Sequence, residues 1–313
     1  MSLASFRLFA LVLVLSLPVW SFEKERNRQT CPSSERQFST LHNKAERGDA
    51  HAQAAMASCY ELGRHVQPSR AETLHWLTLS AEQSYAPAEY ELGRIYLYGR
   101  GIPADYARAR IWMKKASDQG HPQAERDLAF IYERGLGVQA DPAQAADWNR
   151  KAAQQGESEA QLRLAKALEA GQGLPVNAAE AKEWYLRAAR QGLAVAQLRL
   201  ARLYEQEGNR AAATWYEKAA EHGDAQAMYA LGRLYASGRF EMIDRERAYF
   251  WFYLGGRFGS KESQAEAESL VVGLTAARRR RAEKSAGAWI HRHPGAEKEE
   301  DEEEREGRSS FPK

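Results

Sequence analysis

Several features typical of enzymes are missing from this sequence. Its 313 residues contain no HExxH, no GxSxG and no glycine-rich loop that ends in Gly-Lys-Ser/Thr. No paired carboxylates stand in a defined setting, and no segment alternates between apolar and polar residues for long enough to form a β-strand. These absences predict a protein without catalytic residues, bound metal or cofactor, and they argue against a fold built on a β-sheet.

Long apolar runs are also scarce, and the one that exists lies at the N-terminus. Leu8 to Trp20 is an apolar stretch of 13 residues that follows Arg7 and contains Pro18. This is short for a transmembrane helix and typical of a secretory signal, with small residues before a cleavage site at Phe22. We therefore predict a signal peptide at residues 1–21 and a periplasmic or secreted protein. An uncleaved anchor is the alternative.

Cysteine is rare, and both cysteines fall after the predicted signal. Cys31 and Cys59 are the only two in the chain. Two cysteines in an oxidising compartment usually pair, so the predicted export favours a disulfide between them. In the alternative interpretation Cys59 is a small core residue and Cys31 is a free thiol.

The sequence repeats itself over most of its length. Two series share a spacing of 36 residues with one interval of 31: Trp76, Trp112, Trp148, Trp184, Trp215, Trp251 and Ala52, Ala88, Ala124, Ala160, Ala196, Ala227. Such a period is typical of a solenoid. Apolar residues at positions 0, 4, 7 and 8 after each alanine predict an amphipathic first helix, and the tryptophan lies on a second helix. The tryptophans are expected to pack between helices rather than to stack on a carbohydrate.

A glycine pair joins the two helices in several units. It stands in GRGIPAD (99–105), GLGVQAD (135–141) and GQGLPVN (171–177). A dinucleotide-binding loop would need a preceding strand and a third glycine, and both are lacking. Glycine suits the left-handed end of a helix, and Asp105, Asp141 and Asn177 are well placed to cap the next one. The motif is therefore predicted to be a joint and not a phosphate cradle.

These residues resemble the Sel1-like repeat family, a relative of the tetratricopeptide repeats. The segment HPQAERDLAFIYERGLGVQADPAQAADWNRKAA (121–153) carries the family's small residues, tyrosine, Gly-x-Gly, tryptophan and Ala-Ala nearly throughout. The resemblance implies an all-α, right-handed superhelical solenoid of about six repeats that acts as a scaffold or adaptor. Cysteine-rich members have been linked to β-lactam binding, but they carry a cysteine pair in each repeat. Here the six units contain only Cys59, which makes a β-lactam-binding or hydrolysing enzyme the weaker alternative.

The ends of the chain differ from its middle. We expect an N-terminal cap at 22–44, six repeats at 45–256, capping helices at 257–293 with Thr275 as an N-cap, and a disordered acidic tail at 294–313. Residues 297–313 hold eight acids against four bases, a net charge of −4 in a chain of net charge +2. His121 and His222, beside glycines between units, are expected to be exposed.

The first helices offer the candidate binding face. At about 100° per residue, positions 2, 3, 6 and 10 after the leading alanine point away from the apolar stripe. We call these positions the first-helix face, and in this fold they are expected to line a concave groove. The predicted partner-binding residues are Tyr90, Arg94, Arg126, Phe130, Arg163, Lys166, Arg199, Arg202, Tyr229 and Arg233. The alternative is a solvated charged face with acids such as Glu91 and Asp127 nearby.

A basic groove lined with aromatic and aliphatic groups predicts an anionic, partly apolar partner. We therefore expect a non-enzymatic scaffold that binds a protein or an anionic glycan, with envelope polysaccharide or peptidoglycan assembly as the alternative. Nucleic acid is not expected as a partner of an exported protein. The acidic tail is expected to visit the same groove within the chain, in competition with the partner.

Overall fold

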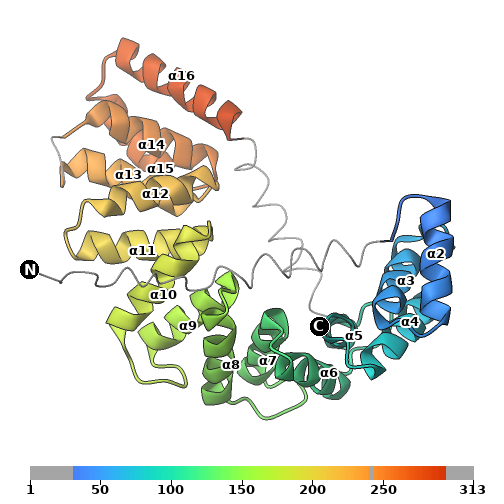
Figure 1. Ribbon diagram of the computed structural model, residues 1–313. Helices are drawn as coiled ribbons and strands as arrows, with labels where there is room; N and C mark the ends of the chain where they lie inside the picture. The colour runs from blue at the N-terminus through green and yellow to red at the C-terminus, as the bar shows by residue number, and fades with distance from the viewer. Residues whose placement is uncertain (1–30, 240–242, 294–313) are drawn as a thin grey trace, which may run out of the picture. The chain divides into compact units, whose positions relative to one another are not determined.

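The computed structural model describes residues 31–239 and 243–293, and these contain fifteen α-helices and no β-strand. The chain divides into two compact units, Met1–Leu128 and Ala129–Lys313. The predicted signal peptide, residues 22–30 of the predicted N-terminal cap and the acidic tail lie outside the described residues. Figure 1 shows the helices, which are α2 Glu35–Glu46, α3 Ala50–Leu62, α4 Arg70–Glu82, α5 Ala86–Tyr98, α6 Tyr106–Asp118, α7 Pro122–Arg134, α8 Pro142–Gln154, α9 Ser158–Ala170, α10 Ala178–Arg190, α11 Ala194–Gln206, α12 Ala211–Glu221, α13 Ala225–Ser237, α14 Arg245–Arg257, α15 Lys261–Val271 and α16 Ala276–Arg292.

The glycine pairs are joints, as predicted. Gly99 ends α5 in the left-handed conformation with φ of 61°, and its N–H donates to the Ile95 carbonyl. Asp105 then caps α6, because its Oδ1 accepts a hydrogen bond from the Arg108 N–H at 2.9 Å. Asp141, Asn177 and Thr275 cap their helices in the same way. The prediction of helical hairpins with capped second helices is confirmed.

In the first unit, a disulfide fastens the chain before α2 to helix α3. Cys31 and Cys59 are bonded and both are buried, so the predicted pairing is confirmed. The Arg64 guanidinium donates to the Cys31 carbonyl at 3.0 Å and reinforces the same junction. Helix α2 packs on α3 and closes the open side of the first hairpin.

Buried amides join consecutive hairpins in both units. In the first unit, Gln53 of α3 donates to the Ala45 carbonyl of α2 at 3.2 Å. In the second, Gln161 and Gln197 donate to the carbonyls of Ala153 and Ala189 at 3.1 and 3.2 Å. Each glutamine side chain is almost fully buried, so its hydrogen bonds fix the register between neighbouring repeats.

The tryptophans line the hairpin interfaces. Trp76, Trp184 and Trp251 are buried, and Trp112 and Trp215 pack at the edges of core clusters. Cations of the same helix cover their outer faces: the Lys115, Lys151 and Lys218 ammonium groups lie 4.1, 3.9 and 4.4 Å from the centroids of Trp112, Trp148 and Trp215. The repeated tryptophans therefore serve to pack the helices together, as expected.

Helices α15 and α16 continue the hairpin pattern beyond the sixth repeat. Ser263 stands 36 residues after Ala227 and is fully buried, like the leading alanines. A β-carbon at Gly255 would lie 2.5 Å from the Ser263 Oγ, which explains why Gly255 stands where repeats two to five have alanine. Trp289 of α16 packs edge-on against Trp251 with the ring centroids 6.3 Å apart. The last hairpin thereby covers the apolar surface of α14.

Candidate interaction face

The residues of the first-helix face lie on α5, α7, α9, α11 and α13, as the period predicts, but they are not equally accessible. Position 2 is largely packed: Tyr90, Leu162 and Leu198 are 8%, 4% and 7% exposed. Position 6 is more open, since Lys166 and Arg233 are exposed and Arg94 and Arg202 are half-buried. The cations at position 6 therefore define the accessible part of the face.

Tyr90, which was predicted to contact a partner, is packed against His121, and the expectation that His121 lies at the surface is wrong. The two rings stack with centroids 4.4 Å apart, and His121 is 6% exposed. The His121 Nδ1 accepts from the Ala124 N–H at 3.3 Å at the start of α7. Burial, aided by the Arg126 charge, lowers the pKa of His121 to about 4. His222 is half-buried.

Charges on the first-helix face of the first unit are compensated locally. Arg94 lies 3.3 Å from the Glu91 carboxylate, one turn away on α5. Arg126 lies 2.8 Å from Asp127, whose side chain is only 4% exposed, and also contacts the Tyr90 hydroxyl at 3.4 Å. Burial raises the pKa of Glu91, and the Arg94 charge opposes this shift. These two arginines take part in structural ion pairs.

At the start of the second unit, Phe130 and Arg163 form another paired site. The Arg163 guanidinium lies 5.6 Å from the Phe130 centroid and 2.9 Å from Glu133. Both charged residues line a cavity of about 310 Å³, which Lys166 and Leu162 also border. Within the described residues, Lys166 makes no hydrogen bond or ion pair and remains an open cation.

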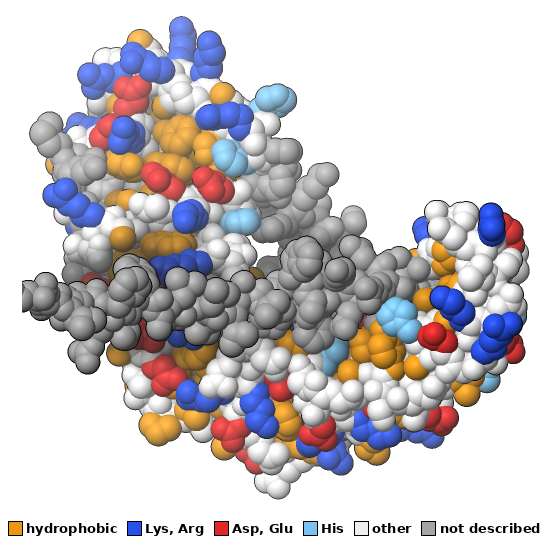
Figure 2. Space-filling model, in the orientation of Figure 1, with side chains coloured by type: hydrophobic (Ala, Val, Ile, Leu, Met, Phe, Trp, Pro, Cys, Tyr) orange, Lys and Arg blue, Asp and Glu red, His pale blue; other side chains and the backbone are white. Residues whose placement is uncertain are grey.

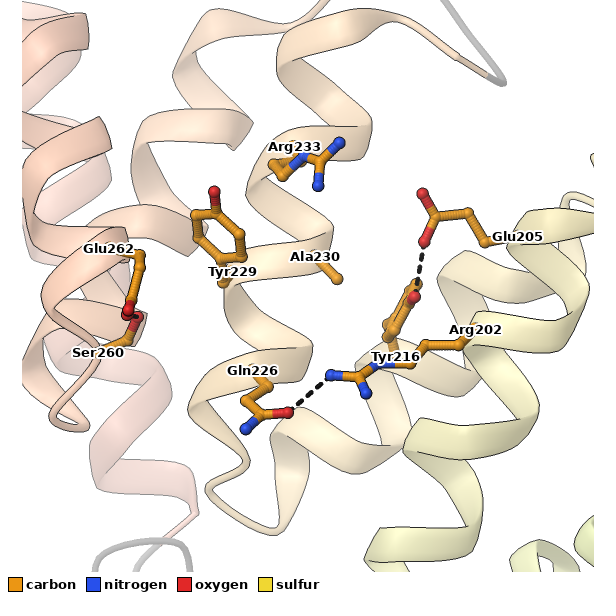
Figure 3. A pocket seen from close by; sticks show the side chains of 9 residues that line it. All are labelled: Arg202, Glu205, Tyr216, Gln226, Tyr229, Ala230, Arg233, Ser260 and Glu262. Carbon is orange, nitrogen blue, oxygen red and sulfur yellow. Dashed lines mark hydrogen bonds between the residues drawn. The ribbon is translucent and has the colours of Figure 1, made fainter. Parts of the chain in front are cut away.

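The last two repeats and the start of α15 line a cavity of about 440 Å³ on this face (Figure 3). Arg202 of α11 donates to the neutral Gln226 amide of α13 at 2.7 Å. Arg233 of α13 borders the same cavity and, in the part of the chain that the structure describes, bonds to no carboxylate. Arg199 on α11 is exposed and, among the described residues, also bonds to no carboxylate. The remaining lining residues are Glu205, Tyr216, Tyr229, Ala230, Ser260 and Glu262.

The sequence reasoning missed a series of acids next to this face. Glu133, Glu169 and Glu205 all stand at position 9 after the leading alanine. Nine residues rotate a helix by about 900°, which brings position 9 beside position 2. This spacing is the signal that could have revealed them. Figure 3 shows that the acid at this position in repeat five, Glu205, is engaged: Tyr216 donates to it at 2.6 Å.

Glu133 pairs with Arg163 of the face, whereas the other two acids, Glu169 and Glu205, are held by tyrosines. Tyr185 donates to Glu169 at 2.7 Å in the same geometry that joins Tyr216 to Glu205. Arg239 adds an ion pair to Glu205 at 3.1 Å. Burial, followed by these hydrogen bonds, raises the pKa of both tyrosines. Among the described residues, Lys166, Arg199, Arg202 and Arg233 form no ion pair with a carboxylate.

Other kinds of site are not seen among the described residues. They contain no group of three or more His, Cys, Asp or Glu side chains placed to hold a metal ion. No helix between Glu35 and Arg292 is long and apolar enough to cross a membrane.

Comparison with known proteins identifies the repeats. The Sel1 repeat matches six consecutive segments: 50–85, 86–121, 122–157, 158–193, 194–224 and 225–257. A search of the curated proteins gives no match.

Two solved structures are similar. A Sel1 repeat protein from Oxalobacter formigenes is 26% identical with a TM-score of 0.59, over 75% of this chain and 94% of that one. The protein c5321, a protective antigen of uropathogenic Escherichia coli, is 25% identical with a TM-score of 0.54, over 87% of this chain. The matched region covers 66% of the length of c5321. The chain belongs to the Sel1 repeat family and is an all-α solenoid of six repeats, a type that generally mediates contacts between proteins.

Proposed function

We propose that this protein is a non-enzymatic scaffold that binds an acidic segment of a partner protein on the first-helix face of repeats four to six. One observation carries the proposal: Lys166, Arg199, Arg202 and Arg233 share this face and, within the described residues, none is paired with a carboxylate. The face arginines of repeats two and three, Arg94 and Arg126, are already paired, and so is Arg163 of repeat four.

The side chains around these cations indicate what the partner segment carries. Tyr229 and Ala230 supply apolar surface beside Arg202 and Arg233 in the cavity of Figure 3. Arginine forks match carboxylates in a two-pronged geometry that lysine lacks. The cavity therefore fits an acidic peptide with an apolar side chain between its carboxylates, and it fits a uniformly charged chain less well.

The disulfide supports an oxidising location. Disulfides persist in the periplasm and outside the cell and are rare in the cytosol. Cys31 and Cys59 form one, and the apolar segment Leu8 to Trp20 precedes them. We place the scaffold in the periplasm or outside the cell.

Photo-crosslinking tests the proposal at the cavity itself. Replacing Tyr229 with p-benzoylphenylalanine puts a reactive ketone on the face in intact cells that express the protein. The expected product is a covalent adduct with an acidic protein, and it should weaken at high salt because exposed charge pairs are screened. A diffuse, protease-resistant adduct would instead assign the face to a glycan of the envelope.

Two matched charge reversals make the test specific. The face variant combines Arg199→Glu, Arg202→Glu and Arg233→Glu. The control combines Arg36→Glu, Arg190→Glu and Arg257→Glu, which changes the net charge equally at exposed positions outside the first-helix face. The adduct should fall about tenfold or more in the face variant and less than about twofold in the control. An adduct that survives the face reversal would discard the proposal.

A further inference from the structure

Helix α16 carries the densest positive charge among the described helices, and it lies outside the six repeats. Arg278, Arg279, Arg280, Arg281, Lys284 and Arg292 stand against a single carboxylate, Glu283, a net charge of +5 in 17 residues. Figure 2 shows lysine and arginine gathered where Figure 1 draws α16. The first-helix face does not include these residues.

Packing fixes the direction in which these cations point. Ala282, Ala286 and Trp289 are buried against α14 and hold one side of α16 to the solenoid. Arg280 and Lys284 lie on the opposite side of the helix and are exposed. Arg278 and Arg281 lie nearer to α14, yet their side chains are still 62% and 69% exposed. The helix cannot rotate to spread its charges without exposing Trp289.

The protein supplies few counter-charges to this surface. Glu246 of α14 lies 4.0 Å from Arg278 and 3.5 Å from Arg281, so one carboxylate serves two arginines. Glu283 is 3.5 Å from Arg279 and also accepts from the Tyr249 hydroxyl at 2.9 Å. Arg280 and Lys284 are exposed and have no ion pair within residues 31–239 and 243–293.

The position of the arginines along the helix makes the charge more costly. Four of them occupy the first two turns of α16, and no acid stands in its first turn. The N-terminal end of a helix carries a partial positive charge, which favours acids there and disfavours bases. Four adjacent arginines at this end therefore destabilise the helix, and helix stability does not explain why they are there.

We propose that the acidic tail, residues 294–313, docks along the exposed arginine face of α16 in the same chain. The segment EKEEDEEERE (297–306) has a net charge of −6 and follows α16 after only a few residues. Its ten residues reach about 33 Å when extended, and α16 is about 25 Å long, so the segment can run back along the whole helix. So short a tether gives a high effective concentration, which a separate anionic molecule does not have.

This docking leaves the first-helix face open. The tail was expected to visit that face, but α16 offers more charge at a shorter tether. The two landing sites are distinguishable because each contains a lysine, Lys284 on α16 and Lys166 on the first-helix face. The proposal does not depend on the proposed function.

Zero-length carbodiimide crosslinking of the full chain, followed by peptide mass spectrometry, tests where the tail lies. The expected product joins Lys284 to a carboxylate of 297–306 within one chain, about fivefold or more above any product at Lys166, and it is lost in 0.5 M salt. Dominant crosslinks at Lys166, crosslinks found only between two copies, or no tail crosslink would each overturn the proposal.

Matched variants complete the experiment. Arg280→Glu with Arg281→Glu should reduce the Lys284 product about fivefold and speed cleavage of the tail by a glutamate-specific protease. The equal charge change Arg199→Glu with Arg202→Glu should alter neither. Replacing the eight acids of 297–306 with Gln or Asn leaves the folded helices untouched and should abolish the product. If full-length protein binds phosphatidylglycerol vesicles and Arg280→Glu with Arg281→Glu removes that binding, the surface belongs to a membrane and the proposal fails.

Discussion

The same helix face has different electrostatics in the two halves of the repeat array. In repeats two and three an acid stands at position 3, Glu91 or Asp127, and it pairs with the arginine beside it or one turn away. In repeats four and five position 3 is itself an arginine, Arg163 or Arg199. The acid at position 3 therefore pairs the charge of the face in repeats two and three. Where it is absent, Arg163 pairs with Glu133 instead, and Arg199 makes no ion pair among the described residues.

The largest expected effect on folding stability is caused by low pH. It concerns His121, in the half of the repeat array where the charges of the first-helix face are paired. The unfolded chain binds a proton at His121 below pH 6.5, whereas the folded chain resists it until about pH 4. Stability is therefore lost as pH falls through this window, by at most about 3 kcal/mol. His121→Asn retains a residue that caps helices well but does not titrate. Urea unfolding at pH 7 and pH 4.5 should show a smaller loss in the variant, and an equal loss would contradict the assignment.

Removing the carboxylate charge should lower the free energy of unfolding more in a buried ion pair than in an exposed one. Asp127→Asn weakens the buried partner of Arg126 and should cost about 2 kcal/mol. Glu133→Gln, which removes the exposed partner of Arg163, should cost less than about 0.5 kcal/mol. Unfolding in urea measures both. Equal losses would mean that the pairs do not differ as their exposure indicates.

Helix spacing offers a third comparison between the halves. A β-carbon at Gly232 would lie 2.5 Å from the ring of Phe252, which is buried and cannot move aside. At Gly93 the nearest atoms, 3.0 Å away, belong to the flexible side chain of Met113. Gly232→Ala should destabilise the protein by about 1.5 kcal/mol, and Gly93→Ala should be near neutral. The midpoint of urea unfolding reports the difference, and the reverse order would refute the packing argument.

The smallest expected effect concerns the tyrosine that holds an acid away from the open cations. Tyr216→Phe deletes the hydrogen bond to Glu205 and should cost about 1 kcal/mol. The control, Tyr253→Phe, removes a hydroxyl for which the described residues show no hydrogen bond and should stay within about 0.5 kcal/mol. Thermal unfolding of both variants checks this. A silent Tyr216→Phe would show that Arg239 alone holds Glu205.

The repeats, their joints and their caps were predictable because each depends on local chemistry. Asp105 precedes a helix that its own side chain caps, and Gly99 supplies the left-handed turn. Both roles follow from the residue type and a fixed spacing. The repeat with the interval of 31 residues departs from them, because Glu207 ends α11 in the right-handed conformation and Arg210 before α12 makes no side-chain cap.

The charge state of the face was less predictable because it depends on contacts between different helices. Arg163 reaches Glu133, 30 residues earlier, and Tyr185 reaches Glu169, 16 residues earlier. Long side chains choose among several neighbours, and the choice is set by packing in three dimensions. The burial of Tyr90 against His121 follows from the same cause.

The Cys31–Cys59 bond has a consequence for how the protein is made. The two cysteines are 28 residues apart, and all six tryptophans of the repeats come later in the chain. Chains emerge from the ribosome N-terminal end first, and contacts close in sequence form quickly. The crosslink can therefore form before the later repeats have folded. A finished first hairpin would then give each following repeat a folded neighbour to assemble on.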